Sequence, residues 1–154
     1  MFATTPHRSS AAHPAATGPS RIPGAGYYAS VGAASAVEDA SPHKLVGLLL
    51  GAVQSEIAAA RGAIARGDVA EKCRAIGHAL RIVDEGLLAP LDLSRGGALA
   101  GNLRDLSQYI VDRLTWANVR TDDEALAEAG RLIATIADGW NGIALQVDGH
   151  VRAA

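Results

Sequence analysis

The chain has 154 residues, of which 49% are hydrophobic, and a formal net charge of −2 at pH 7. This length favours one domain, and the near-neutral charge excludes a general electrostatic attraction to nucleic acid or to an anionic membrane. The single cysteine, Cys73, excludes an internal disulfide, and the longest apolar run is too short to cross a bilayer. We therefore expect a cytoplasmic protein that does not insert into membranes.

Residues 1–40 differ in composition from the rest of the chain. Four prolines interrupt a run of Ala, Ser, Thr and Gly, and there is too little apolar side chain to offset the entropy cost of ordering the segment. We expect a flexible, mostly disordered N-terminal tail. Residues 22–31 are the exception, because Tyr27 and Tyr28 have no core role that the pattern assigns. This short segment is expected to dock on the folded part of the chain.

Four helices are expected over residues 41–148, at about 42–65, 69–89, 96–119 and 122–145. Ser41 followed by Pro42 is typical of a helix start, and Gly67 is typical of a helix end. Asp68 and Thr121 each precede a glutamate by three residues, which is the spacing of a capping box. Short links make neighbouring helices antiparallel. The predicted fold class is therefore all-α, an antiparallel up-down-up-down four-helix bundle.

The predicted third helix is apolar on more than one side. One face is predicted to hold Leu99, Leu103, Leu106, Ile110, Leu114 and Ala117, while Tyr109, Val111 and Trp116 point elsewhere. The second helix carries a seam pattern made of Val69, Cys73, Ile76, Leu80, Val83 and Leu87, which predicts that Cys73 is buried. Because a bundle core covers only one face of a helix, the second apolar side of the third helix indicates a partner.

Metal and catalytic chemistry find little support in the sequence. None of the five histidines lies at metal-ligand spacing with a cysteine or carboxylate, so we expect no metal, no cofactor and no enzymatic activity. His78 is a separate case, because residues 78–81 read His-Ala-Leu-Arg. This run is similar to the His-x-Leu-Lys pattern of histidine phosphotransfer domains, which are also four-helix bundles, and the seam pattern turns His78 outward. A phosphotransfer domain that uses His78 and a structural bundle that self-associates through the third helix are the alternative functions.

An ordered set of short motifs runs along the helices. It consists of Tyr27 and Tyr28, then Ala40-Ser41-Pro42-His43-Lys44-Leu45-Val46, Ala63-Ile64, Gly67-Asp68, Ile82-Val83-Asp84-Glu85-Gly86-Leu87, Leu91-Asp92, Gly96-Gly97-Ala98-Leu99-Ala100, Asn102-Leu103, Tyr109, Leu114, Ala117-Asn118, Asp122 and Trp140. In this order and spacing, roughly residues 27–140 resemble the flagellar export chaperone family called FliS. The chain departs from the family pattern at residues 106–109, where it reads Leu-Ser-Gln-Tyr and the family often has Leu-Tyr-Asp-Tyr.

The resemblance implies a bacterial chaperone that binds the C-terminal helical segment of flagellin, prevents its premature polymerisation and aids its export by flagellar type III secretion. The expected binding groove comprises Leu103, Leu106, Tyr109, Ile110, Arg113, Leu114 and Asn118. The four aliphatic members can equally belong to the core, Asn118 can equally cap a helix end, and Trp140 is expected in the core. Tyr27 and Tyr28 would cover part of the groove in the free chaperone. Further expected partners are the export machinery and a co-chaperone or anti-sigma factor, and the chain is expected as a monomer or weak homodimer.

Overall fold

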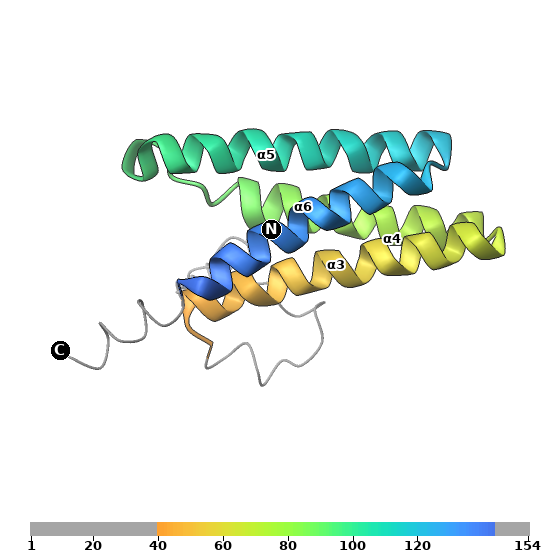
Figure 1. The fold of residues 1–154 in the computed structure, drawn as a ribbon, viewed down its shortest axis with the longest axis horizontal. Helices are drawn as coiled ribbons and strands as arrows, with labels where there is room; N and C mark the ends of the chain where they lie inside the picture. The colour runs from red at the N-terminus through yellow and green to blue at the C-terminus, as the bar shows by residue number, and fades with distance from the viewer. Residues whose placement is uncertain (1–39, 144–154) are drawn as a thin grey trace, which may run out of the picture.

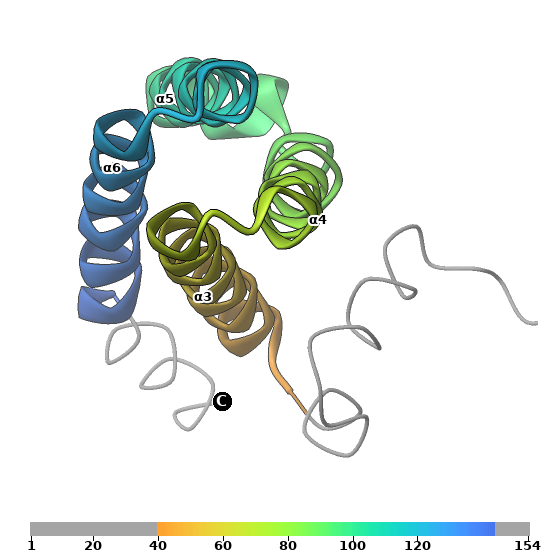
Figure 2. The same cartoon turned by 90° about the vertical axis from the view of Figure 1, so that its right-hand side faces the viewer.

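The computed structural model describes residues 40–143, so the expectations for the N-terminal tail, for Tyr27 and Tyr28, and for the chain beyond residue 143 lie outside the described residues. The elements in order are α3 (Pro42–Arg66), α4 (Val69–Arg81), the π-helical segment η1 (Ile82–Leu88), α5 (Leu93–Arg120) and α6 (Asp123–Gly142). Successive helices run in opposite directions (Figure 1), and the end-on view shows α3, α4, α5 and α6 arranged around a common centre (Figure 2). Within residues 40–143 there is no strand, so the predicted all-α four-helix bundle is confirmed.

The helix ends largely follow the predicted capping residues. Ser41 Oγ accepts a hydrogen bond from the Lys44 amide at 3.3 Å at the start of α3, and Gly67 ends that helix with φ 70°. Asp68 Oδ1 accepts from the Glu71 amide at 3.0 Å at the start of α4. The prediction that Thr121 caps the fourth helix is wrong by one residue. Thr121 adopts left-handed geometry and ends α5, and the Asp122 carboxylate accepts from the Ala125 amide at 3.1 Å.

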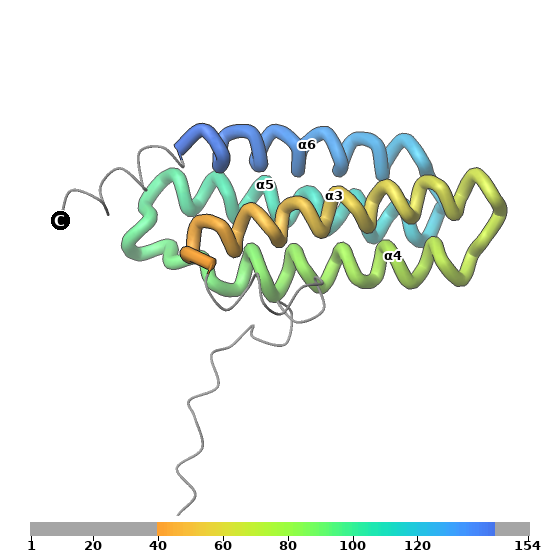
Figure 3. Tube along the Cα trace, turned by 90° about the horizontal axis from the view of Figure 1, so that it is seen from below, coloured from red at the N-terminus to blue at the C-terminus, as the bar shows by residue number. Residues whose placement is uncertain are grey.

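The core is one continuous cluster to which all four helices contribute. Its large side chains are Leu49, Leu50, Val53, Ile57, Ile76, Ile82, Val83, Ile110, Leu114, Leu126 and Ile133. The helix α3 lies between α4 and α6 (Figure 3) and packs against both. An 18-residue window of this 25-residue helix has a mean hydropathy of 1.2, so the helix is long and apolar enough for a membrane span by length and composition alone, and 33% of that window is buried in the bundle. The largest of its buried side chains, Leu49, Leu50, Val53 and Ile57, belong to the core cluster.

The buried face of α4 differs from the predicted seam. Cys73 is exposed, so the expectation that it is a core residue is wrong. The face that packs inward carries Ala75, Ile76 and Ala79 together with the stem of Lys72. The seam prediction counts large apolar residues, whereas alanines permit the close approach of two helices and therefore decide which side of α4 turns inward.

The start of α5 extends further toward the N-terminus than predicted. The Asp92 carboxylate accepts from the amides of Ser94 at 3.0 Å and Arg95 at 3.1 Å, so the helix begins at Leu93 rather than near residue 96. Gly97 interrupts the helical geometry with φ 54° and ψ −138°. Only glycine adopts this combination readily, because a Cβ would crowd the backbone.

Replacing Gly97 with alanine is therefore expected to lower the free energy of unfolding by about 1–3 kcal/mol, the usual cost of holding a non-glycine residue in such a region. Chemical denaturation followed by circular dichroism measures the change. Gly101→Ala is the matched control, because Gly101 is helical and a Cβ added there would meet no neighbouring atom within 4 Å. An unchanged stability in Gly97→Ala would show that the first turn of α5 can straighten without cost.

Candidate partner-binding site

An apolar pocket of about 200 Å³ lies at one end of the bundle, where α3, η1, α5 and α6 come together. We call it the end pocket. It is lined by Val46, Leu50, Gly86, Leu87, Pro90, Leu91, Leu103, Ser107, Ile136 and Trp140. None of these side chains is ionisable, and only Ser107 carries a hydroxyl group. The end pocket therefore suits an apolar group rather than a charged one.

One wall of the end pocket is the π-helical segment η1. The Ala89 amide donates to the Asp84 carbonyl at 2.9 Å, which is the five-residue hydrogen bond of a π-turn. Gly86 and Leu87 of this segment reach the pocket. A Cβ placed on Gly86 would lie 3.1 Å from Leu49 Cδ1, so the glycine allows η1 to approach α3 closely. Such π-turns are rare and occur often at functional sites.

Trp140 forms another wall and is held by His43 through a ring contact and two hydrogen bonds. The two rings stack with centroids 4.9 Å apart and an angle of 7° between their planes. Trp140 Nε1 donates to the His43 carbonyl at 2.9 Å, and His43 Nε2 lies 2.8 Å from the Trp140 carbonyl, which requires the imidazole to donate from that nitrogen. Trp140 packs against the core with part of its side chain exposed. This pair ties the start of α3 to the end of α6 beside the end pocket.

The structure separates the predicted groove residues into different places. Leu103 lines the end pocket, and Leu106 packs partly buried against the core. Ile110 and Leu114 have no exposed surface. A partner cannot contact these two side chains while the bundle is folded. Of the two roles expected for them, groove or core, they therefore have the core role.

Tyr109 and Arg113 lie at the seam between α5 and α6. The Tyr109 hydroxyl donates to Glu128 Oε1 at 2.6 Å, and Arg113 Nε forms an ion pair with Glu128 Oε2 at 2.6 Å. The hydrogen bond from Tyr109, with the nearby Arg113 charge, lowers the pKa of Glu128. The same hydrogen bond raises the pKa of Tyr109. Both residues are thus already engaged within the bundle, although the Tyr109 ring remains exposed.

Asn118 lies near the end of α5 beside a buried lysine that the helical pattern does not predict. Lys72 is only 5% exposed, and its Nζ donates to the Asn118 carbonyl at 2.8 Å and to Thr121 Oγ1 at 3.1 Å. Helix ends leave carbonyls without partners, and a cation there is favourable. The residue that ends the helix is Thr121, so Asn118 is not the cap. The sequence held one signal for the burial of Lys72. It precedes the buried Ala75 and Ile76 by three and four residues, which places it on the same face of α4.

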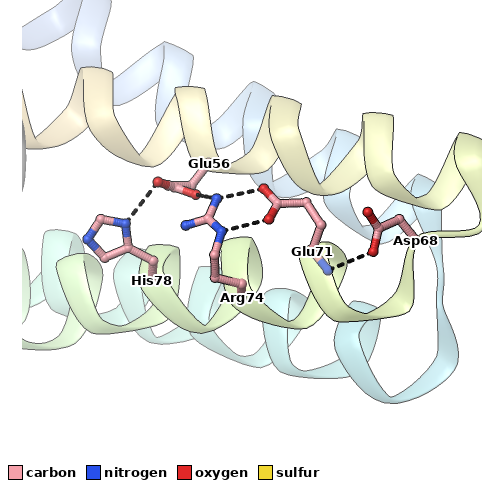
Figure 4. A network of polar contacts seen from close by, with 5 residues as sticks. All are labelled: Glu56, Asp68, Glu71, Arg74 and His78. Atoms are coloured by element: carbon pink, nitrogen blue, oxygen red, sulfur yellow. Dashed lines mark hydrogen bonds and ion pairs between the residues drawn. The ribbon is translucent and has the colours of Figure 1, made fainter.

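His78 does not face outward as the seam pattern predicts. Its side chain is 24% exposed, and its Nδ1 lies 2.8 Å from Glu56 Oε1 of α3. Arg74 bonds both Glu56, at 3.0 Å, and Glu71, so His78 sits in a polar network between two helices (Figure 4). Among residues 40–143 no group of three potential metal ligands gathers there or elsewhere. The geometry offers no support for phosphotransfer through His78.

An ion pair connects α3 and α6 away from the end pocket. Arg61 Nε and Nη2 bond the two oxygens of Asp123 at 2.8 and 3.0 Å. The hydrogen bond from Arg61 lowers the pKa of Asp123. A carboxylate whose pKa is lower in the folded state stabilises the fold above its unfolded pKa, about 3.9, and this contribution is lost as the pH falls through the folded pKa.

The free energy of unfolding of the wild-type chain should therefore decrease as the pH falls below about 5. The free energy of unfolding of Asp123→Asn should decrease less steeply over the same range. Urea midpoints measured at several pH values test this expectation. Nearly half of each side chain of the pair is exposed, so the effect is expected to be small and to weaken with salt. Parallel curves for the two proteins would show that the Arg61 pair contributes nothing to acid sensitivity.

An apolar pocket at one end of a helical bundle, with no acid or base lining it, is the kind of site that suits the binding of apolar parts of other molecules. The chain belongs to the FliS family of flagellar secretion chaperones, because the family described as Flagellar protein FliS matches residues 25–147. It is 41% identical to the flagellar secretion chaperone FliS of Salmonella typhimurium over 116 residues, which are 75% of this chain and 86% of that protein.

Two further relatives support the same assignment. The flagellar secretion chaperone FliSB of Pseudomonas aeruginosa is 41% identical over 75% of this chain and 91% of its own length. The flagellar secretion chaperone FliS of Escherichia coli is 35% identical over 73% of this chain and 83% of its own length. Residues 25–147 include all four helices, so the family resemblance inferred from the sequence motifs is confirmed.

Proposed function

We propose that this chain is a cytoplasmic chaperone that binds the C-terminal helical segment of flagellin, prevents its premature polymerisation and aids its export by the flagellar type III secretion system. Membership of a family of flagellar secretion chaperones supports a role in export. The single structural observation that carries the binding proposal is the end pocket, an apolar space of about 200 Å³ that no described side chain fills.

The surroundings of the end pocket suit a bound helix. Leu99, which is 69% exposed, precedes the pocket residue Leu103 by one helical turn on α5. Leu93 and Ile143 are also exposed, at the start of α5 and the end of α6. An amphipathic helix can lay its apolar face on such a surface, and burial of that face supplies most of the binding free energy.

Isothermal titration calorimetry with a peptide of the flagellin C-terminal segment tests this proposal. We expect a complex with a negative heat-capacity change, because apolar surface leaves water. Leu103→Asp should weaken binding by at least about tenfold, since a carboxylate in the end pocket has no partner. Val119→Asp is the matched control, because Val119 is 75% exposed near the opposite end of α5.

Circular dichroism should show the same helical content in both variants before binding is compared. Absence of any complex at tens of micromolar peptide would count against flagellin as the partner. Equal losses of affinity in Leu103→Asp and Val119→Asp would count against the end pocket as the contact site.

A further inference from the structure

The inward face of α5 holds one residue that is small for its position. Steps of three and four residues connect Ala100, Leu103, Ser107, Ile110, Leu114 and Ala117, all of them buried except for the partly buried Leu103. This is the spacing of a bundle seam, in which the central positions normally carry large aliphatic side chains. Ser107 is 5% exposed and lies between Leu103 and Ile110, yet its side chain is only a hydroxymethyl group. It lines the end pocket.

A second small residue lines the same pocket from η1. Gly86 has no side chain, and its backbone lies so close to α3 that an added Cβ would press on Leu49. Leu49 is not among the residues that line the pocket, so a side chain at position 86 would meet the core rather than fill the pocket, and Ser107 is the small residue that leaves this space open. Protein interiors contain few voids larger than a water molecule, and an apolar cavity of about 150 Å³ is large enough to hold benzene. The end pocket, at about 200 Å³, exceeds that size.

The chemistry of the lining selects the occupant. No ionisable side chain lines the end pocket, so a phosphate, a carboxylate or a metal ion would lose its water without gaining a partner. The volume fits one large apolar side chain. The exposed Leu99, one turn along α5 from Leu103, extends the apolar surface beside the pocket, where the backbone of a bound helix can lie.

We propose that the end pocket is a specificity pocket for one leucine, methionine or phenylalanine side chain of the exported polypeptide, and that the small side chain of Ser107 keeps it open. This inference rests on the proposed function, because it takes the helical segment of flagellin as the molecule that carries the side chain. Residues that line a ligand site often lower stability in exchange for binding. Filling the pocket from within should therefore stabilise the bundle and weaken the complex.

Ser107→Leu tests the inference, with Ser107→Ala as the matched control that removes the hydroxyl and adds no bulk. We expect Ser107→Leu to raise the melting temperature by about 4 °C or more and to weaken binding of the flagellin peptide about tenfold to hundredfold. Ser107→Ala should bind within about twofold of wild type. Replacing the one large apolar residue of the peptide that enters the pocket with alanine should weaken the binding of the peptide to wild type. Wild type and Ser107→Leu should then bind this shortened peptide with similar affinity.

If Ser107→Leu does not fold, Ser107→Val adds less volume and serves in its place. Unchanged peptide affinity in the filled variant, or a loss that no single shortened peptide position restores, would overturn the inference. If wild type binds no flagellin peptide, the proposed function fails, and fluorine NMR with fluorobenzene then tests the pocket alone. Binding of fluorobenzene to wild type and its loss in Ser107→Leu would support the part of the inference that the end pocket accepts one apolar group and that Ser107 keeps it open, whereas equal behaviour of both proteins would overturn it.

Discussion

Shortening Leu114 to alanine is expected to lower the free energy of unfolding by about 2–5 kcal/mol, the range for removing a large side chain from a packed core. Leu114 has no exposed surface and packs with Ile110 in the central cluster. The folded fraction of the variant should bind the flagellin peptide with wild-type affinity, because the side chain contacts only the core. Urea denaturation measures the first effect, and calorimetry at a temperature where the variant is folded measures the second.

Leu99→Ala is the matched control for the change in stability. It removes the same atoms from the same helix at a site that is 69% exposed, so stability should change by less than about 0.5 kcal/mol. A Leu114→Ala variant that keeps its stability and loses affinity would place this residue at the partner surface, and would mean that the bundle opens when the partner binds.

Replacing Lys72 with methionine is expected to lower the free energy of unfolding by about 1–3 kcal/mol. Methionine keeps an apolar stem of similar length, so the change isolates the ammonium group. Without it, the Asn118 carbonyl at the end of α5 loses a hydrogen bond of 2.8 Å in a part-buried place, and the Thr121 hydroxyl loses one of 3.1 Å. Thermal unfolding, with hydrogen exchange of the last turn of α5, measures the global and the local effects.

Lys44→Met is the control for Lys72, since Lys44 is exposed in the first turn of α3 and its removal should be nearly neutral. Two opposing effects determine whether Lys72→Met lowers or raises the free energy of unfolding. The variant avoids burying an ammonium group, but it leaves acceptors without a donor. A Lys72→Met variant more stable than wild type would show that the first effect is larger.

Local chemistry predicted the helices well because helix ends depend on near neighbours. The start of α3 at Ser41 and Pro42, its end at Gly67 and the cap at Asp68 all involve contacts within a few residues. The shift from Thr121 to Asp122 is of the same local kind. A threonine in left-handed geometry can end one helix while the next residue caps the following helix, and spacing alone does not separate the two roles.

The orientation of each helix about its own axis was harder to predict. On α5 the predicted stripe included Leu99 and Leu106, whereas Ala100 and Ser107 face the centre. On α4 the exposed Cys73 and the buried Lys72 show the same kind of displacement. The helical repeat fits two neighbouring faces that differ by one residue. The less buried face carried the larger apolar side chains, so the pattern predicted that face as the buried one.

By itself the sequence determined the helical class, the approximate helix bounds and, through an ordered set of short motifs, membership of a secretion chaperone family. Only the tertiary structure decided that Ile110 and Leu114 close the core, that Lys72 holds the end of α5, and that an apolar pocket stays open at one end. The physical reason is that capping and periodicity act between residues close in the chain. A pocket is the space that side chains from four separate helical segments leave unfilled. It exists only where a small side chain of one segment faces the side chains of the others.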